Sequence, residues 1–223
     1  MAYNAGVTTT RSYLTVDREW GPEDFLDKGS RFVSFLHSAA DRLSAEAYIT
    51  ALRERFADAT HVCYAWRLGK GEESEHRYND DGEPGGTAGL PIYNEIRRRD
   101  YLNVVVAVVR YYGGVKLGTG GLARAYGKAA RLVLEASRPK KILLTDPASI
   151  VFPFDFTGEV MQVVRRLDLA ITGQDYSPAG TTLNVLVPRG TMEALRNTLR
   201  EAGGGKVSLK PAVKGKWKVE SGK

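Results

Sequence analysis

The sequence predicts an α+β protein of two domains, and three observations lead to that class. Segments rich in β-branched and aromatic residues, typical of strands, alternate with segments in which apolar residues recur at helical spacing. Pro139, within the sequence "RPKK", ends a long helical segment and is typical of an interdomain junction. After that junction the segments follow the order β-α-β-β-α-β. We therefore predict one domain over residues 1–138 and a second over residues 139–223.

The elements of the first domain follow from the spacing of its apolar residues. The run "NVVVAVVR" at 103–110 is the most apolar, and it predicts a strand that is buried on both faces. In chain order we predict a polar arm at 1–29, a strand at 31–39, a helix capped by Ser44, a strand at 61–68, a polar hairpin or loop at 69–86, a short helix that follows Thr87 and ends near Arg99, the strand at 103–110, a glycine-rich turn at 113–121 and a helix at 122–137.

The second domain has the order of a ferredoxin-like fold. In chain order we predict a strand at 142–154, a helix at 158–167, a pair of strands at 171–176 and 182–187, a helix at 192–202 and a strand at 206–219. Such a domain places both helices on one face of a single sheet.

Positive charge is concentrated in the second half of the chain. The protein has 223 residues, a formal net charge of +6 and a pI of about 9.4. Residues 1–137 contain 18 Lys and Arg against 18 Asp and Glu, whereas residues 138–223 contain 14 against eight. The lysine-rich tail fits a solvated edge strand that lysines protect from aggregation, and it fits contact with a polyanion equally well.

The remaining composition predicts a cytoplasmic protein. The longest apolar run, 104–109, is far too short to cross a bilayer, and the N-terminal residues contain no apolar signal-peptide core. The single cysteine, Cys63, has no partner for an internal disulfide, which fits a reducing compartment. No heptad pattern is present, and we therefore expect a monomer.

An acidic turn is the first segment that contains candidate functional residues. Within "YNDDGEPGGTAGLP" at 78–91, carboxylates close in sequence are able to hold Mg²⁺ or to act as an acid–base pair. Asp-Gly and Pro-Gly are also ordinary residues of surface turns, which is the alternative interpretation. The candidate functional residues of this turn are Asp80, Asp81, Glu83 and Thr87, and Thr87 is also a candidate N-cap of the helix that follows. We assign no metal, cofactor or catalytic residue.

A glycine-rich loop between a strand and a helix is the second segment. Such loops expose backbone N–H groups that bind phosphate or a nucleic-acid backbone, although glycines also permit close packing of a helix on a sheet. The candidate residues for anion or nucleic-acid binding are Arg110, Tyr111, Tyr112, Gly113, Gly114, Lys116, Gly118, Gly120, Gly121, Arg124 and Lys128. Arg131 adds charge, and Tyr111, Tyr112 and Tyr126 offer surfaces for stacking bases.

Several familiar motifs are incomplete. Gly113 and Gly118 have Walker A spacing, but Thr119 and Gly120 stand where that motif requires Lys and Ser or Thr. His61 and Cys63 alternate on one predicted strand, and so they share a face. A nucleophilic Cys–His pair is conceivable there, although a lone strand cysteine is more often a small core residue.

The two segments resemble the Impact family, also called YigZ-like. The residues that carry the resemblance are "DDGEPGGTAGLP" at 80–91 and "VVVAVVRYYGGVKLGTGGLARAY" at 104–126, supported by "KGSRF" at 28–32 and "HVCYAWRLG" at 61–69. The pair Gly85–Gly86 and the residue Tyr112 are mild departures from the family pattern.

The resemblance implies a fold for each domain and a connection to translation. It implies an N-terminal domain like the second domain of ribosomal protein S5 and a C-terminal ferredoxin-like domain that resembles a translation elongation factor module. Eukaryotic relatives are linked to translational control through a scaffold that activates a stress kinase. They use an extra N-terminal domain for much of that task, and we do not expect their partner to carry over to this chain.

Three functions follow from these observations. The basic second half, the glycine-rich loop and the resemblance favour a binding protein that associates with RNA, the ribosome or a translation-related protein. The first alternative is a protein-interaction adaptor that does not bind nucleic acid. The second is an enzyme for a phosphorylated small molecule, with the loop as phosphate site and the acidic turn as base or Mg²⁺ site.

Overall fold

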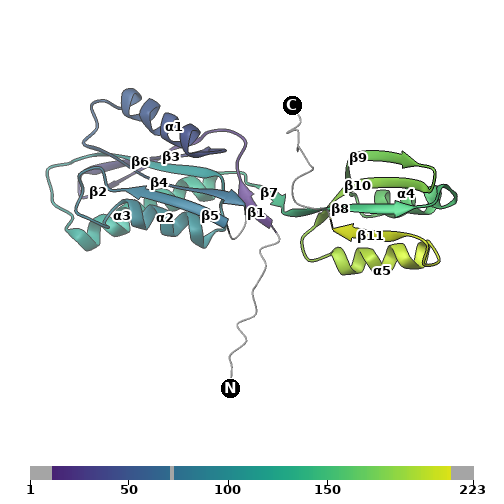
Figure 1. Cartoon of the computed structure of the whole chain (residues 1–223). Coiled ribbons are helices and arrows are strands. Elements are labelled where there is room, and N and C mark those ends of the chain that lie inside the picture. Colours follow the sequence, from purple (N-terminus) through teal and green to yellow (C-terminus); the bar gives the residue numbers. More distant parts are fainter. Residues whose placement is uncertain (1–11, 71–72, 212–223) are drawn as a thin grey trace, which may run out of the picture. The chain divides into compact units, whose positions relative to one another are not determined.

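The structure, a computed structural model, describes residues 12–70 and 73–211 (Figure 1). The described chain divides into two compact units, one over Ser12–Ile142 and the other beginning at Leu143. Both units combine helices with antiparallel sheets, so the predicted α+β class is confirmed. No helix in the described ranges is long and apolar enough to cross a membrane.

The first unit is built on a five-stranded antiparallel sheet with the strand order β2-β3-β6-β4-β5. Its strands are β2 (Trp20–Asp27), β3 (Ser30–Ser38), β4 (His61–Lys70), β5 (Glu73–Asn79) and β6 (Val104–Tyr111). The central strand is β6, and residues 104–109 are fully buried. The apolar run was therefore a correct predictor of a strand covered on both faces.

Helices cover both faces of this sheet. Helix α1 (Arg42–Arg55) packs on one face, and α2 (Gly89–Arg98) and α3 (Thr119–Ala136) pack on the other (Figure 1). The alternation of side chains along β6 separates the two cores, because Val105 and Val109 face α1 whereas Val104 and Val108 face α2 and α3.

Helix termini differ from the prediction at two places. Asp41, not Ser44, is the N-cap of α1: its Oδ1 accepts a hydrogen bond of 2.8 Å from the Ser44 N–H, and the Ser44 hydroxyl accepts one of 3.1 Å from the Asp41 N–H. This is a capping box in which Ser44 occupies the third helical position. Helix α3 begins at Thr119, so Gly120 and Gly121 lie within the helix and not in the preceding loop.

A two-stranded sheet joins segments that are far apart in sequence. Strand β1 (Ser12–Thr15) pairs with β7 (Lys140–Leu143). The predicted strand at 142–154 is therefore two strands, because β7 pairs with β1 whereas β8 (Thr145–Phe152) belongs to a different sheet.

The second unit has one antiparallel sheet with the strand order β11-β8-β10-β9. Its elements follow β8 as a short 3-10 helix η1 (Phe154–Phe156), α4 (Thr157–Arg166), β9 (Ala170–Ser177), β10 (Gly180–Pro188), α5 (Met192–Ala202) and β11 (Ser208–Pro211). Both helices pack on the same face, since one cluster joins Ile150 and Val185 of the sheet with Val160 of α4 and Leu195 of α5. Residues 212–219 of the last predicted strand lie outside the described residues.

Candidate functional site

The acidic turn is organised by its own first carboxylate. Asp80 accepts three backbone hydrogen bonds, from the N–H groups of Gly86, Ala88 and Gly89 at 2.8, 2.9 and 2.8 Å. These bonds fix the loop between β5 and α2 and satisfy the first amides of that helix. The side chain of Asp80 is therefore committed to the loop itself.

Asp81 connects the turn to the neighbouring strand and helix. Its carboxylate accepts the Val62 N–H at 2.7 Å and pairs with Nη2 of Arg53 at 2.6 Å. Its own N–H donates to Oδ1 of Asn79 at 2.7 Å, and its φ of +47° lies in the left-handed region that Asp tolerates better than most residues. Asp81 thus secures the turn against β4 and α1.

Glu83 points inward from the turn to a buried polar cluster. Its Oε1 accepts hydrogen bonds from Nη1 of Arg110 at 2.6 Å and from the Tyr126 hydroxyl at 2.7 Å. The side chains of Glu83 and Arg110 are only 4% and 6% exposed. His61 is the fourth member, with its Nε2 atom 3.8 Å from the same carboxylate oxygen.

All three carboxylates of the turn are therefore engaged by donors of the protein. Among the residues described, no group of three or more His, Cys, Asp or Glu side chains is arranged to hold a metal ion. Thr87 is not the N-cap of α2, a position that Ala88 occupies. The Thr87 hydroxyl donates instead to the Pro84 carbonyl at 2.6 Å and closes the turn locally. Through these contacts the turn anchors the β5–α2 loop to the neighbouring strand and helices.

His61 and Cys63 share one face of β4 and both contact the turn. The Asp81 carbonyl lies 2.7 Å from Nδ1 of His61, and because a carbonyl only accepts, Nδ1 is the donor. The Cys63 thiol donates to the Asp80 carbonyl at 3.0 Å. Burial raises the pKa of Cys63 well above its ordinary value, so the thiol stays protonated at neutral pH. A protonated, buried thiol is a poor nucleophile, and Cys63 is a core residue.

The beginning of the glycine-rich loop packs against the β2–β3 turn. A Cβ atom at Gly113 would overlap the carbonyl group of Gly29, so only glycine permits this approach. The Ser30 hydroxyl accepts hydrogen bonds from Gly113 N–H at 3.3 Å and from Nη2 of Arg110 at 3.2 Å. The close-packing interpretation of the loop glycines thus holds at Gly113.

Two predicted binding residues, Arg110 and Tyr126, are not available to an outside anion or base. Arg110 lies in the core and is neutralised by Glu83, because its strand position turns it toward the helices and not toward solvent. Tyr126 is fully buried beneath α3. The Tyr111 hydroxyl donates to Asp58 at 3.1 Å, but the residue is only partly buried, and Tyr112 is 46% exposed, so both remain candidates for stacking.

The N-terminus of α3 carries unpaired backbone donors. Gly118 is its N-cap, with φ +72°, and supplies no side-chain cap, while the first turn contains no acidic residue. The first α-helical bond to the cap runs from the Leu122 N–H to the Gly118 carbonyl at 2.9 Å. The N–H groups of residues 119–121 therefore have no carbonyl acceptor within the helix. The dipole of this 18-residue helix also places partial positive charge at the same end. Lys116 is exposed just before it.

A row of basic residues continues along α3. Arg124, Lys128 and Arg131 are exposed at helical spacing and line a groove of about 600 Å³ between α3 and α2. The α2 side contributes Pro91, Asn94 and Glu95. The structure thus brings Arg124 and Lys128 together in one groove with Arg131, which the sequence also indicated as a source of positive charge.

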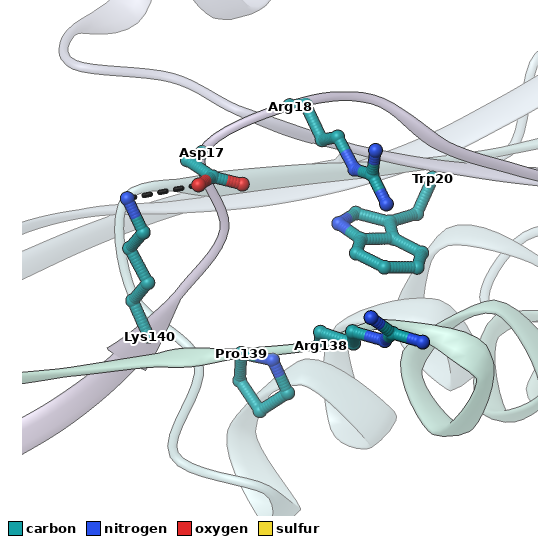
Figure 2. A pocket seen from close by; sticks show the side chains of 6 residues that line it. All are labelled: Asp17, Arg18, Trp20, Arg138, Pro139 and Lys140. Atoms are coloured by element: carbon teal, nitrogen blue, oxygen red, sulfur yellow. Dashed lines mark ion pairs between the residues drawn. The ribbon is translucent and has the colours of Figure 1, made fainter.

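A second basic pocket combines residues from both ends of the first unit (Figure 2). It is lined by Asp17, Arg18, Trp20, Arg138, Pro139 and Lys140 and has a volume of about 540 Å³. None of these side chains was a candidate from the sequence, because the pairing of β1 with β7 that unites them is long-range. The only local signal was the basic run at 138–141.

Comparisons with known proteins agree with this architecture. The family model of the Impact N-terminal domain matches residues 28–134. YigZ of Escherichia coli (strain K12), an IMPACT family member, is 32% identical over 184 residues, which cover 82% of this chain and 89% of YigZ. YvyE of Bacillus subtilis (strain 168), another member, is 39% identical over 118 residues, which cover 53% of this chain and 54% of YvyE. The chain thus spans nearly nine tenths of one relative and about half of the other.

A solved structure is similar over almost the whole length. The crystal structure of a hypothetical protein has a TM-score of 0.60 and 27% sequence identity, and the match covers 92% of this chain and 100% of that one. Fold and site define a two-unit α+β protein with an anchored acidic turn and a basic helix face. The chain belongs to the IMPACT family.

Proposed function

We propose that this protein binds RNA, associates with the ribosome and acts in translational control, with α3 as its principal contact. The observation that carries the proposal is the uncapped N-terminus of α3 together with the row Arg124, Lys128 and Arg131 beside a groove. A helix N-terminus followed by cations at one-turn intervals offers successive sites to the phosphates of one strand.

The groove is positively charged because its acid is already neutralised. Glu95 pairs with Arg98 at 2.7 Å and also with Arg99, which in turn contacts Glu135 at 2.7 Å. Within the described part of the chain, Arg124, Lys128 and Arg131 form no salt bridge with an acidic side chain. Three unneutralised cations in an open groove favour a polyanionic ligand.

The second unit supports the proposal less than its sequence suggested. Residues 143–211 contain seven Lys and Arg against seven Asp and Glu, so the excess charge lies at 138–141 and in the tail beyond the described residues. The sheet face opposite the helices presents Ser149, Val151, Thr182, Asn184 and Leu186 from β8 and β10, without an aromatic platform for bases. We therefore locate the RNA contact in the first unit.

The finer fold assignments belong to the same proposal. The strand order β11-β8-β10-β9, with the sequence β-α-β-β-α-β, supports a ferredoxin-like second unit. Family membership supports a first unit like the second domain of ribosomal protein S5. Fold similarity to translation proteins is analogy, so the functional proposal rests on the basic face of α3 and not on the fold.

A double substitution tests the proposal with a matched control. Lys116→Ala/Arg124→Ala removes two cations at the start of α3, and Arg165→Ala/Arg166→Ala removes two exposed cations from α4 of the second unit. We expect the first variant to weaken binding of labelled single-stranded RNA and to reduce the slope of log K against log salt by about 1.4, or 0.7 per phosphate contact. Equal affinity and slope for the two variants and the wild type would remove α3 from the proposal.

One observation favours the alternative of a protein-interaction adaptor. An apolar hollow of about 240 Å³ lies in the second unit and includes Leu167, Leu169, Val187 and Leu195 among its lining residues. Leu167 is 41% exposed at its rim. If RNA fails to bind in the experiment above, this hollow is the surface at which to seek a protein partner.

A further inference from the structure

The pocket around Trp20 has the components of a nucleotide site. Trp20 begins β2, Arg18 precedes it, and Arg138, Pro139 and Lys140 lead from the end of α3 into β7. In Figure 2 the indole ring lies above Arg138 and Pro139, with open space between the ring and the chain below it. This pocket belongs entirely to the first unit and adjoins the C-terminal end of α3.

The Trp20 ring is held in place on one side, and its indole nitrogen lacks a hydrogen-bond partner in the described structure. The guanidinium carbon of Arg18 lies 4.4 Å from the ring centroid, and the ring packs partly against the core cluster that includes Val133 and Leu134 of α3. Its Nε1 atom is buried and has no hydrogen-bond partner in the described structure. In Figure 2 this nitrogen lies on the side of the ring that faces Asp17 and Lys140. The buried nitrogen is out of reach of a ligand in the pocket, whereas a rigid aromatic ring in the pocket wall favours a planar ligand.

The charges of the pocket select for an anion. Three of its six lining residues are basic, and the one acid, Asp17, is paired with Nζ of Lys140 at 2.8 Å. Arg18 and Arg138 are exposed. The pocket therefore combines an aromatic ring with two guanidinium groups that are available to phosphates, since arginine binds phosphate in a bidentate manner.

We propose that this pocket captures an unpaired base of single-stranded RNA, which stacks on the free face of Trp20 while Arg18 and Arg138 contact the adjacent phosphates. The inference rests on the RNA binding proposed above and specifies its substrate class. A base in a duplex has both faces stacked on its neighbours, so a stacking pocket selects unpaired nucleotides.

Helix α3 connects this pocket to the proposed phosphate contacts. Its 18 residues span about 27 Å from the glycine-rich loop to the segment that enters the pocket. A strand whose phosphates follow Arg124, Lys128 and Arg131 thus reaches Arg138 and Trp20 at the far end of the helix.

Tryptophan fluorescence reports directly on this pocket. Of the three tryptophans, Trp66 is 1% exposed, and Trp217, which lies outside the described residues, is removed by a Trp217→Phe background substitution. In that background we would titrate a single-stranded RNA of about 12 nucleotides, the same RNA as a duplex, and an abasic strand of equal length, and follow binding by anisotropy in parallel. We expect the single strand to quench Trp20 fluorescence at the Kd that anisotropy gives, and the abasic strand to bind with little quenching.

Substitutions in the pocket distinguish a loss of base stacking from a loss of folding. Trp20→Leu is expected to weaken single-strand binding by about 5- to 150-fold, the range for loss of one base–aromatic stack, whereas Trp20→Phe retains most of the affinity. Arg138→Ala, at an exposed position, tests the same pocket without disturbing the core and is expected to weaken binding and reduce quenching.

The outcomes distinguish this inference from the proposed function. RNA binding without quenching, and with unchanged affinity in Trp20→Leu and Arg138→Ala, would overturn the pocket and leave RNA binding intact. Equal quenching by duplex and single strand would overturn base capture. Absence of any anisotropy change at about 50 mM salt would overturn the proposed function and this inference together.

Discussion

Oε1 of Glu83 lies 2.6 Å from Nη1 of Arg110, and both side chains are buried between the sheet and the helices of the first unit. This pair connects the acidic turn to the end of β6, the strand that leads into the glycine-rich loop. The Tyr126 hydroxyl, from α3, donates to the same carboxylate oxygen. One buried carboxylate thus holds the turn, β6 and α3 together, and it positions the α3 N-terminus on which the proposed function depends.

We expect Glu83→Gln to destabilise the protein by about 3–5 kcal/mol. The substitution keeps an acceptor for Tyr126 but leaves the buried Arg110 without a counter-charge. Asp24→Asn is the matched control, because its partner Arg31 is 54% exposed and an exposed pair contributes about 1 kcal/mol or less. Urea unfolding measures the free energy of unfolding of both variants. A similar decrease in the two variants would show that the buried pair contributes no more stability than the exposed pair.

Two glycines of the segment 113–121, one in the loop and one in the first turn of α3, are expected to respond oppositely to alanine. Gly113→Ala places a Cβ against the Gly29 carbonyl and should destabilise the protein by at least about 1–3 kcal/mol. Gly120 lies in the first turn of α3, where a Cβ would meet only the Arg124 guanidinium at 3.5 Å. Gly120→Ala should therefore be neutral or stabilise by up to about 1 kcal/mol. Thermal unfolding of both variants checks the contrast, and tolerance of alanine at Gly113 would contradict the packing of this loop.

The Cys63 thiol should be unreactive in the native protein. Burial is the main cause of its raised pKa, so the thiolate that attacks disulfide reagents is scarce, and access requires opening of the core. We expect labelling at pH 8 to be on the order of 100-fold slower or more than in denaturant. Rapid labelling of the folded protein, with circular dichroism unchanged, would contradict this environment.

The Asp17 carboxyl should titrate below its ordinary pKa of 3.8, because Lys140 donates a hydrogen bond to it. Since the pKa is lower in the folded state, the pair favours folding above pH 3.8, and this contribution is lost as the pH falls through the lower, folded value. Carboxyl NMR of the wild type and of Lys140→Met checks the cause. A midpoint unchanged by the substitution would contradict the role of Lys140.

Elements with a strong apolar period were predictable from sequence. Helix α5 begins at Met192 and ends at Ala202 as predicted, because its apolar residues recur every three or four positions. Strand β2 was missed, since it contains Gly21 and Pro22, whereas β5, which consists mostly of polar residues at a sheet edge, was predicted only as part of a polar hairpin or loop. Their position at the edge lets them pair without the apolar alternation by which strands are recognised.

The site was less predictable than the fold because its contacts are long-range. The sequence located the acidic turn and the basic residues of α3, but it did not show that Glu83 neutralises Arg110 or that Arg110 faces the core. The Trp20 pocket depends on β1 pairing with β7 across almost the whole first unit. No local pattern encodes such a pairing, which is determined by tertiary packing.

The most direct test of RNA binding is the affinity of the purified protein for total RNA and for ribosomes across a salt series. We predict a Kd of about 1–100 μM near physiological salt, and a slope of log K against log salt of about −2 to −3, as expected for three or four phosphate contacts along α3. No binding at about 50 mM salt, or binding that does not change with salt, would contradict the account.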